Sequence, residues 1–286
     1  MSSLLIFGYG YTARFFVRAV QDDFKTFLGT TRRQLVKKEG AVSLLRFDGV
    51  DADPVLHEAV MQAEAVLVSV PPDERGDPVL DSFADLLAGN KNLRWLGYLS
   101  SVGVYGDHQG AWVDEHAPLY PQNDRSRRRV EAEQAWLDLG LDAGVAVHVF
   151  RLAGIYGPGQ NALVNIRNGN AKRIIKEGQV FNRIHVEDIA RVLRASLHAP
   201  QPEAIYNVSD DEPAPPQDVV TYAALKMGVD LPPAYPFEKA PLSPMALSFY
   251  GENKRVSNAL IKQELGVSLA YPTYRQGLDA LYAAGE

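Results

Sequence analysis

A short glycine-containing turn near the start of the chain constrains its fold more than any other feature. The turn runs from Gly8 to Ala13, reads GYGYTA, and directly follows the apolar run 4–7. Gly8 and Gly10 allow a tight bend and a close approach of the backbone to a ligand, and an amphipathic segment follows them. This order predicts a buried strand that turns at once into a helix, which is how a nucleotide-binding α/β sheet begins.

The first half of the chain repeats this alternation of short apolar runs with amphipathic segments. We expect strands at 4–7, 26–30, 42–47, 65–69, 95–100 and 145–151. We expect helices between them at 12–21, 54–61, 79–87 and 125–139. Strands that alternate with helices predict an α/β fold, a Rossmann-type doubly wound parallel sheet, although the order of the strands is not visible from the sequence.

The regular alternation of apolar runs and amphipathic segments ends after residue 155. Short elements follow, among them a helix at 186–198 and a strand at 204–208, and then a proline-rich C-terminal third. We expect residues 1–155 to form a dinucleotide-binding Rossmann domain, with 186–210 returning to it. Residues 156–185 and 211–286 would form a smaller substrate-binding lobe over the C-terminal edge of the sheet.

The composition excludes several classes of function. A formal net charge of −6 is unlike that of a nucleic-acid-binding protein, which neutralises phosphates with a basic face. The absence of cysteine excludes disulfides, thiolate metal sites and a cysteine nucleophile, and it fits a reducing cytoplasm. The apolar start is too short for a signal peptide, and no stretch reaches the roughly 20 apolar residues of a membrane helix. We therefore expect a cytoplasmic protein without a nucleic-acid, membrane or metal partner.

The glycine-containing turn has the residues that a dinucleotide needs. Gly8 would permit the tight bend, Gly10 would let the backbone approach the pyrophosphate, and Ala13 stands where a third glycine often packs helix against strand. The phosphates would lie at the start of the helix, near Tyr11 and Thr12, where free N–H groups and the helix dipole attract anions. The alternative is a strand-to-helix turn that merely requires small residues.

Three further strand ends complete the expected cofactor site. Arg32 and Arg33 follow the second strand, where an acidic residue would suit the ribose 2′-hydroxyl of NAD, so two guanidinium groups favour the 2′-phosphate of NADP. Asp48 follows the third strand, where its carboxylate would accept from the adenine amino group, and Ser69 and Pro71 end the fourth, beside the nicotinamide ribose. Each would otherwise be a solvated helix start or an ordinary strand end. We expect NADP as the cofactor, with NAD as the alternative.

Five motifs occur in a fixed order along the chain. They are residues 8–13 (GYGYTA), 99–106 (LSSVGVYG), 151–159 (RLAGIYGPG), 185–190 (HVEDIA) and 206–208 (YNV). Together they resemble the extended short-chain dehydrogenase/reductase family, which contains NAD-dependent sugar-nucleotide epimerases and dehydratases. The resemblance covers about the first three-quarters of the chain and implies a Rossmann fold with a nicotinamide cofactor.

The resemblance also implies where the catalytic residues would stand. The catalytic serine of the family is Ser101 here, but the positions of its catalytic tyrosine and lysine align with Arg125 and Arg129. The chain therefore resembles an atypical member that lacks the Tyr-x-x-x-Lys pair. Arginine, with a pKa above roughly 12, has no proton to exchange, although it still binds and polarises an oxyanion. Either another residue has taken the acid–base role, or the usual chemistry is not carried out.

Several side chains on neighbouring segments are candidates for that role. We name Tyr105 as a candidate catalytic residue, and we also consider Tyr120, Tyr156, Asp107, Asp114, Glu115 and His116. Each has an ordinary structural alternative, because the tyrosines would fill turns of the scaffold and the other residues would cap or solvate a loop.

Arg125 and Arg129 lie four residues apart and would share one face of a helix. If they face the nicotinamide, with Arg151 and Arg183 nearby as substrate-binding residues, they would form a pocket for a carboxylate or phosphate. The alternative is a solvated basic face that neighbouring glutamates balance.

These observations predict an NAD(P)-binding oxidoreductase or epimerase/dehydratase-like enzyme that acts on an unidentified, anionic small molecule. The alternative is a non-catalytic NADP-binding regulatory or assembly protein. The expected partner is the small-molecule substrate, and a homodimer remains open.

Overall fold

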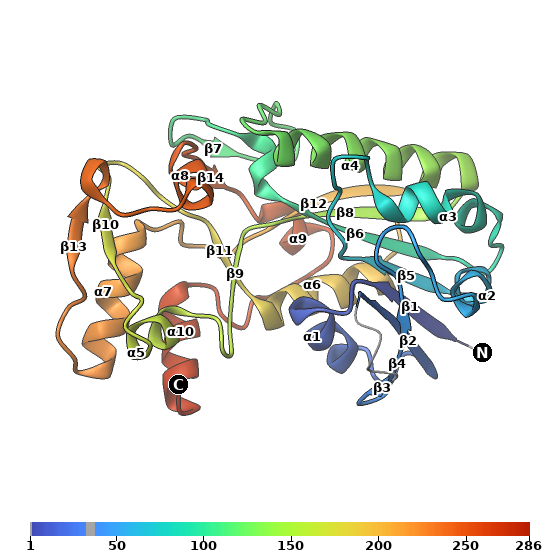
Figure 1. Ribbon diagram of the computed structural model, residues 1–286, viewed down its shortest axis with the longest axis horizontal. Helices are drawn as coiled ribbons and strands as arrows, with labels where there is room; N and C mark the ends of the chain where they lie inside the picture. The colour runs from blue at the N-terminus through green and yellow to red at the C-terminus, as the bar shows by residue number, and fades with distance from the viewer. Residues whose placement is uncertain (1, 33–37) are drawn as a thin grey trace.

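An eight-stranded sheet forms the centre of the molecule, which the computed structural model describes over residues 2–32 and 38–286 (Figure 1). The strands are β1 (Ser3–Phe7), β2 (Thr26–Thr31), β3 (Lys38–Glu39), β4 (Val42–Arg46), β5 (Ala65–Val68), β6 (Trp95–Ser101), β8 (Ala146–Leu152) and β12 (Glu203–Val208). Their order is β12-β8-β6-β5-β1-β2-β4-β3. All neighbours are parallel except the short edge pair of β3 and β4. The predicted doubly wound α/β fold is confirmed.

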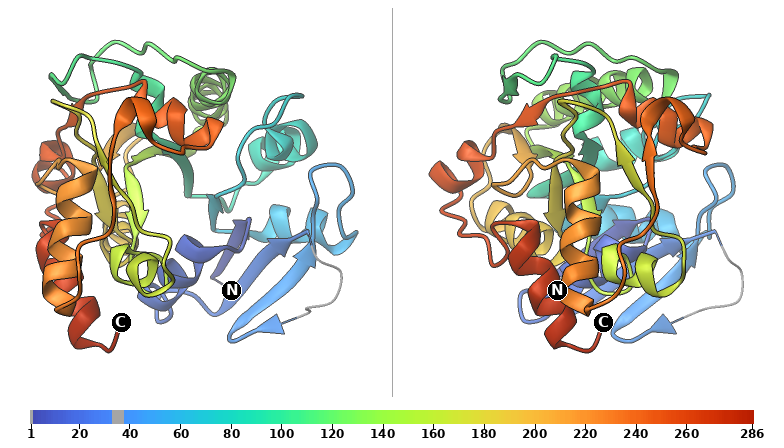
Figure 2. Two further views of the ribbon diagram at one scale, coloured as in Figure 1. Left: turned by 60° about the vertical axis from the view of Figure 1, so that its left-hand side comes forward. Right: turned by 90° about the vertical axis from the view of Figure 1, so that its left-hand side faces the viewer.

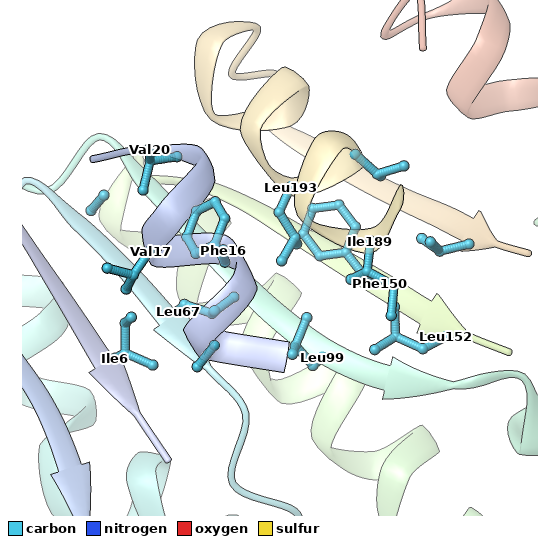
Figure 3. Close-up of a cluster of buried hydrophobic side chains, with 14 of the residues drawn as sticks. Ile6, Phe16, Val17, Val20, Leu67, Leu99, Phe150, Leu152, Ile189 and Leu193 are labelled. Atoms are coloured by element: carbon cyan, nitrogen blue, oxygen red, sulfur yellow. The ribbon is translucent and has the colours of Figure 1, made fainter. Parts of the chain in front are cut away.

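Helices cover both faces of this sheet (Figure 1). Successive side chains of β1 face opposite layers, because side chains alternate along a strand. One layer holds α1 (Tyr11–Ala19) and α6 (Val186–His198), whose apolar side chains meet those of the strands in Figure 3. The other layer holds α2 (Val55–Gln62), α3 (Pro78–Gly89) and α4 (Asp124–Ala143). Within the described residues, no helix is long and apolar enough to cross a membrane.

The order of the strands reverses between β1 and β5. β1 pairs with β2 on one side and with β5 on the other, both in parallel. Such a reversal leaves a crevice beyond the carboxyl ends of the strands, where ligands of open α/β sheets bind. The turn that begins at Gly8 stands at this point, directly after β1.

A smaller lobe lies beyond the carboxyl ends of the strands, on the left in Figure 1. Its elements are β9 (Gly154–Tyr156), α5 (Ala162–Arg167), β10 (Arg173–Ile175), β11 (Arg183–His185), α7 (Pro216–Met227), β13 (Ala234–Pro236) and α10 (Tyr274–Ala283). β9 pairs with β11 and β10 pairs with β13, while α5, α7 and α10 share one apolar cluster. Figure 2 shows α7 and α10 packed side by side. Because α5 precedes β12 and α7 follows it, the chain crosses between the sheet and the lobe more than once.

A C-terminal segment returns from the lobe to the end of β6. It includes η2 (Phe237–Lys239), α8 (Pro244–Tyr250), β14 (Arg255–Val256) and α9 (Ala259–Gln263). β14 pairs with β7 (Trp112–Val113), and Val256 packs against the 3₁₀ helix η1 (Val102–Tyr105) that follows β6. This return brings the residues before β14 close to those that follow β6, although the two segments are far apart in the sequence.

All the strands and helices expected in the first half are present, and most ends agree within two residues. The largest difference is α4, which continues to Ala143 instead of ending at residue 139. Gly140 lies inside the helix, where its missing side chain lets β8 approach: a Cβ there would lie 2.6 Å from Val147. The helix ends only at Gly144, whose φ of +65° is left-handed.

Candidate functional site

The turn after β1 has a geometry that requires its glycines. Gly8 adopts a φ of +86°, and a Cβ on it would lie 3.1 Å from the side chain of Val70. The turn is tied to β2, because the Gly8 N–H donates to Thr30 Oγ1 and the Tyr9 N–H donates to the Thr30 carbonyl, both at 2.9 Å. A Cβ on Gly10 would meet only the Gly8 carbonyl, at 3.9 Å, so the space beside Gly10 is open. The turn therefore presents accessible backbone at the start of α1, as an anion site requires.

A cavity of about 450 Å³, here called the turn cavity, opens beside this turn. Its lining comes from the carboxyl ends of β1, β2, β4 and β5. It includes six residues of the expected cofactor site, which are Gly8, Gly10, Arg32, Asp48, Ser69 and Pro71. The volume is typical of a small-molecule pocket. The fold thus gathers residues from four separate strand ends around one space at the switch point of the sheet.

The other residues expected at the cofactor lie behind or outside this lining. Tyr11 and Thr12 begin α1, and Ala13 is buried in the core between α1 and the sheet. The Tyr11 hydroxyl donates to the Pro158 carbonyl at 2.9 Å and so connects α1 to the smaller lobe. Arg33 lies outside the described residues.

Two charged side chains, Arg32 and Asp48, line the turn cavity. Arg32 is exposed. The Asp48 carboxylate accepts from the N–H groups of Asp51 at 2.9 Å and Val50 at 3.1 Å, and from the Arg46 guanidinium at 2.7 Å. These hydrogen bonds, that of the Asp51 N–H above all, lower the pKa of Asp48. Asp48 is therefore an ionised acceptor held in place by its own loop.

A second cavity, of about 460 Å³ and here called the cleft, lies between the end of β6 and the smaller lobe. Ser101, the last residue of β6, lines it together with Gly103 of η1. The Ser101 hydroxyl caps η1 by accepting from the Gly103 N–H at 3.1 Å. A Cβ on Gly103 would lie 3.2 Å from Ser126 Oγ and 3.4 Å from Ser101 Oγ, so the start of α4 packs closely on this turn. The structure therefore places Ser101 in the cleft, beside the first turn of α4.

The two arginines of α4 have separate surroundings. Arg125 is exposed, and its guanidinium carbon lies 5.3 Å from the centre of the Phe249 ring, which lines the cleft. Arg129 donates from Nη1 to the Leu99 carbonyl of β6 at 2.8 Å. Neither arginine belongs to the lining of the cleft. The shared helical face thus does not produce a joint anion pocket, because each guanidinium has its own neighbour, and Arg125 alone reaches the rim.

Arg151 and Tyr105 also lie outside the cleft. Arg151 occupies the face of β8 that packs on α4, where it forms an ion pair with Glu133 at 2.8 Å, both side chains being 4% exposed. The Tyr105 hydroxyl accepts from Arg151 at 2.9 Å and donates to Asn207 at 2.7 Å. Burial raises the pKa of Tyr105 to about 12. The alternation of β8 turns Arg151 away from the cleft, and both residues belong to a buried structural network instead.

Arg183, by contrast, stands where a ligand would meet it. It lines both the cleft and a third cavity of about 700 Å³ in the smaller lobe. Its Nη1 donates to the carbonyls of Phe181 at 3.0 Å and Ala214 at 3.2 Å, whereas Nε and Nη2 make no hydrogen bond within the described part of the chain. The nearby Asp210 has an unpartnered Oδ2, and burial raises the pKa of Asp210 to about 8. Arg183 therefore offers free donors, beside a carboxyl that is largely neutral at pH 7, in a wall shared by two cavities.

The segment that contains Ser101 and both arginines of α4 is shared with known proteins. Residues 83–209 match the NAD dependent epimerase/dehydratase family. This segment of the chain is therefore similar to that family. A structure described as a putative NAD-dependent epimerase/dehydratase from Methylobacillus flagellatus is 25% identical, with a TM-score of 0.73, and the match covers 99% of this chain and 98% of the other.

Further relatives of the chain have less defined activities or share the fold alone. A functionally unknown conserved protein from Silicibacter pomeroyi DSS is 50% identical over 99% of both chains, with a TM-score of 0.91. Protein YeeZ of Escherichia coli (strain K12) is 29% identical over 222 residues, 75% of this chain and 74% of that protein. The dTDP-glucose 4,6-dehydratase of Bacillus anthracis, solved with NAD, has the same fold at 17% identity and a TM-score of 0.77, over 100% of this chain and 98% of its own.

The cleft contains two residues that the sequence did not reveal. Glu252 and Lys254 line the cleft together with Ser101. Lys254 is 5% exposed and Glu252 is 9% exposed, and Lys254 Nζ donates to Glu252 Oε2 at 2.7 Å and to the Gly106 carbonyl at 2.8 Å. They lie in the proline-rich C-terminal third, where no motif or spacing signals a site. Only the pairing of β14 with β7 brings them to the end of β6.

Proposed function

We propose that the chain binds a nicotinamide dinucleotide in the turn cavity and uses it in an oxidoreductase or epimerase/dehydratase-like reaction. One observation carries this proposal: residues expected at a dinucleotide, from the ends of four separate strands, line a single cavity at the switch point of the sheet. The residues fit this cofactor at Gly10, where a Cβ would extend into the open space that a pyrophosphate needs.

Each part of the dinucleotide would have a group of the chain to hold it. The free N–H groups at the start of α1 would bind the pyrophosphate, because unpaired amides and the helix dipole attract anions. The Asp48 carboxylate would accept from the adenine amino group. The exposed Arg32 favours the 2′-phosphate of NADP over the 2′-hydroxyl of NAD. When bound, the nicotinamide would supply or accept a hydride.

The substrate side of the proposal depends on Ser101 and Arg183. The Ser101 hydroxyl would hold a carbonyl or hydroxyl oxygen in the cleft. The free Nε and Nη2 of Arg183 would bind a carboxylate or phosphate in a bidentate manner. MoeE5, which shares the fold at 18% identity and a TM-score of 0.76, was solved with UDP-glucuronic acid and NAD, and this agrees with an anionic substrate. We therefore assign the substrate to the class of small anionic molecules.

A second function, a non-catalytic NADP-binding regulatory or assembly role, is favoured by one observation. Arg129 donates to the Leu99 carbonyl, and the resemblance aligns Arg125 and Arg129 with the family's tyrosine and lysine. Neither side chain exchanges a proton near neutral pH. A protein of this kind would bind the cofactor without turning over.

Hydride transfer separates these two functions. NADPH that carries deuterium at C4 of the nicotinamide would be incubated with the protein and a panel of oxo acids and sugar nucleotides, and mass spectrometry would detect deuterium in the products. If the protein is an enzyme, the label is transferred to the product. The Ser101→Ala variant should transfer the label more slowly but bind NADPH like the wild type. Tight NADPH binding without any transfer supports the regulatory role. No binding of NADPH or NADH in calorimetry would refute both.

A further inference from the structure

The cleft contains one pair of ionisable side chains that can exchange protons. Among the described residues, its ionisable lining consists of Tyr156, Arg183, Glu252 and Lys254. An arginine such as Arg183 keeps its proton throughout the ordinary pH range. Burial raises the pKa of Tyr156 far above its usual value. Glu252 and Lys254 are therefore the pair that remains for acid–base chemistry.

Lys254 and Glu252 form a buried ion pair, in which one N–H group of Lys254 has no partner among the described residues. Their side chains are 6% and 9% exposed, and the two atoms of the pair lie 2.7 Å apart. A buried pair loses the hydration of both charges and seldom adds net stability, so packing alone does not account for it. Of the three N–H groups on the Lys254 ammonium, one donates to Glu252 and one to the Gly106 carbonyl. The third has no partner within the described residues and is free for a molecule in the cleft.

The surroundings of Lys254 act on its charge in opposite directions. Desolvation by burial is the largest effect and lowers the pKa of Lys254, while the carboxylates of Glu252 and Asp107 raise it, and the pKa is lowered on balance. Asp107 lies on the loop after η1 and accepts from the Asn253 N–H at 2.9 Å. An amine in this environment gives up its proton more readily than an ammonium on the surface.

We propose that Lys254, with Glu252 as its partner, is the acid–base group of the cleft in place of the family's tyrosine. This inference rests on the proposed function. In the direction of reduction, the bound nicotinamide would supply the hydride for the new C–H bond at a substrate carbonyl carbon, and Lys254 Nζ would donate a proton to the carbonyl oxygen. The neutral amine left beside Glu252 then takes a proton from water. In oxidation, the neutral amine would accept the hydroxyl proton, and the oxidised nicotinamide, when bound, would accept the hydride.

The position of Lys254 along η1 also narrows the substrate. Ser101 precedes the first residue of η1, and Lys254 Nζ contacts Gly106, which follows the last. A 3₁₀ helix of this length spans about 8 Å, at roughly 2 Å per residue. Ser101 and Lys254 thus stand at opposite ends of η1 in the lining of one cleft. A molecule of several carbons with at least two oxygen functions would meet both groups.

The titration of Lys254 in the full-length protein tests the inference without turnover. Protein with ¹³C-labelled lysine would be titrated by NMR through the Cε resonances, and the resonance lost in Lys254→Arg assigns Lys254. We expect Lys254 to titrate below the exposed lysines, because burial penalises its ammonium form. In Glu252→Gln it should titrate lower still, because the carboxylate that favours the ammonium is removed. A Lys254 that titrates with the exposed lysines, or a Glu252→Gln variant that raises its pKa, overturns the proposal.

Access from the cleft has its own readout. Glyoxylate with cyanoborohydride carboxymethylates an amine by imine formation and reduction, and mass spectrometry locates the product. Lys254 should be modified at neutral pH ahead of the exposed Lys91, because more of it is the neutral amine. Modification of Lys91 with Lys254 untouched overturns the proposal. Thermal melting verifies that each variant is folded. NADPH affinity, measured on the same wild-type protein, distinguishes the two possible failures. A protein that does not bind NADPH refutes the proposed function, whereas normal NADPH affinity with an ordinary Lys254 titration refutes only this inference.

Discussion

A methyl group on Gly10 is expected to weaken cofactor binding without weakening the fold. Gly10 has a φ of −110° and a ψ of −157°, an extended conformation that alanine adopts freely, and its Cβ would meet only the Gly8 carbonyl at 3.9 Å. The free energy of unfolding of Gly10→Ala should therefore change by less than about 0.5 kcal/mol, as at an open surface position. A pyrophosphate packed on the turn would meet the methyl group, and overpacking a fitted contact costs about 1–3 kcal/mol. The dissociation constant for NADPH should then rise roughly 5- to 150-fold.

Calorimetric titration with NADPH and urea unfolding measure these two quantities on the same protein. Gly8→Ala is the matched control, because its φ of +86° is costly for any residue with a Cβ, by about 1–2 kcal/mol, and the new atom would lie 3.1 Å from Val70. That variant should lose stability, whereas Gly10→Ala should not. A folded Gly10→Ala variant that binds NADPH as the wild type does would refute the reasoning, since the pyrophosphate would then lie elsewhere.

Three further substitutions address the cofactor, the core and the pH dependence. Arg32→Ala should weaken NADPH binding about tenfold and leave NADH binding nearly unchanged in calorimetry, because a charge-assisted hydrogen bond contributes roughly 1.5–3 kcal/mol; an equal loss for both cofactors would contradict the assignment to the 2′-phosphate. Glu133→Ala should lower the free energy of unfolding by about 3–5 kcal/mol in urea, since it leaves the buried Arg151 unpaired, and a loss below about 1 kcal/mol would contradict this. Burial raises the pKa of Asp210 to about 8, so its contribution to stability is complete below the unfolded value near 4 and falls as pH rises through 8. The free energy of unfolding of Asp210→Asn, relative to that of the wild type, should therefore increase from pH 5 to pH 8. A decrease over this range would show that Asp210 is ionised in the fold.

Local sequence patterns were sufficient for the sheet and the turn. The apolar run 4–7, the small residues Gly8 and Gly10, and the amphipathic segment behind them follow one another directly in the sequence. β1 and α1 were therefore predictable from sequence neighbours. The gathering of the strand-end residues around one cavity was predictable for a related reason, because the carboxyl ends of parallel strands meet at one edge of the sheet.

The cleft depends on contacts that the sequence does not express. The helical spacing of Arg125 and Arg129 gives their common face but not their partners, and the Leu99 carbonyl and the Phe249 ring come from other segments. Arg151 could have been placed correctly, because period-two alternation sets which face of β8 it occupies. Lys254 had no local signal at all, since the long-range pairing of β14 with β7 brings it to the end of β6.

A crystal structure of the protein grown with saturating NADPH tests the central claim most directly. We predict one dinucleotide per chain in the turn cavity, with its pyrophosphate on the N–H groups at the start of α1 and beside Gly10. The 2′-phosphate should lie within hydrogen-bonding distance of Arg32, and the nicotinamide should point toward Ser101 in the cleft. A turn cavity without the dinucleotide at saturating NADPH, or a dinucleotide bound elsewhere on the protein, would contradict the account.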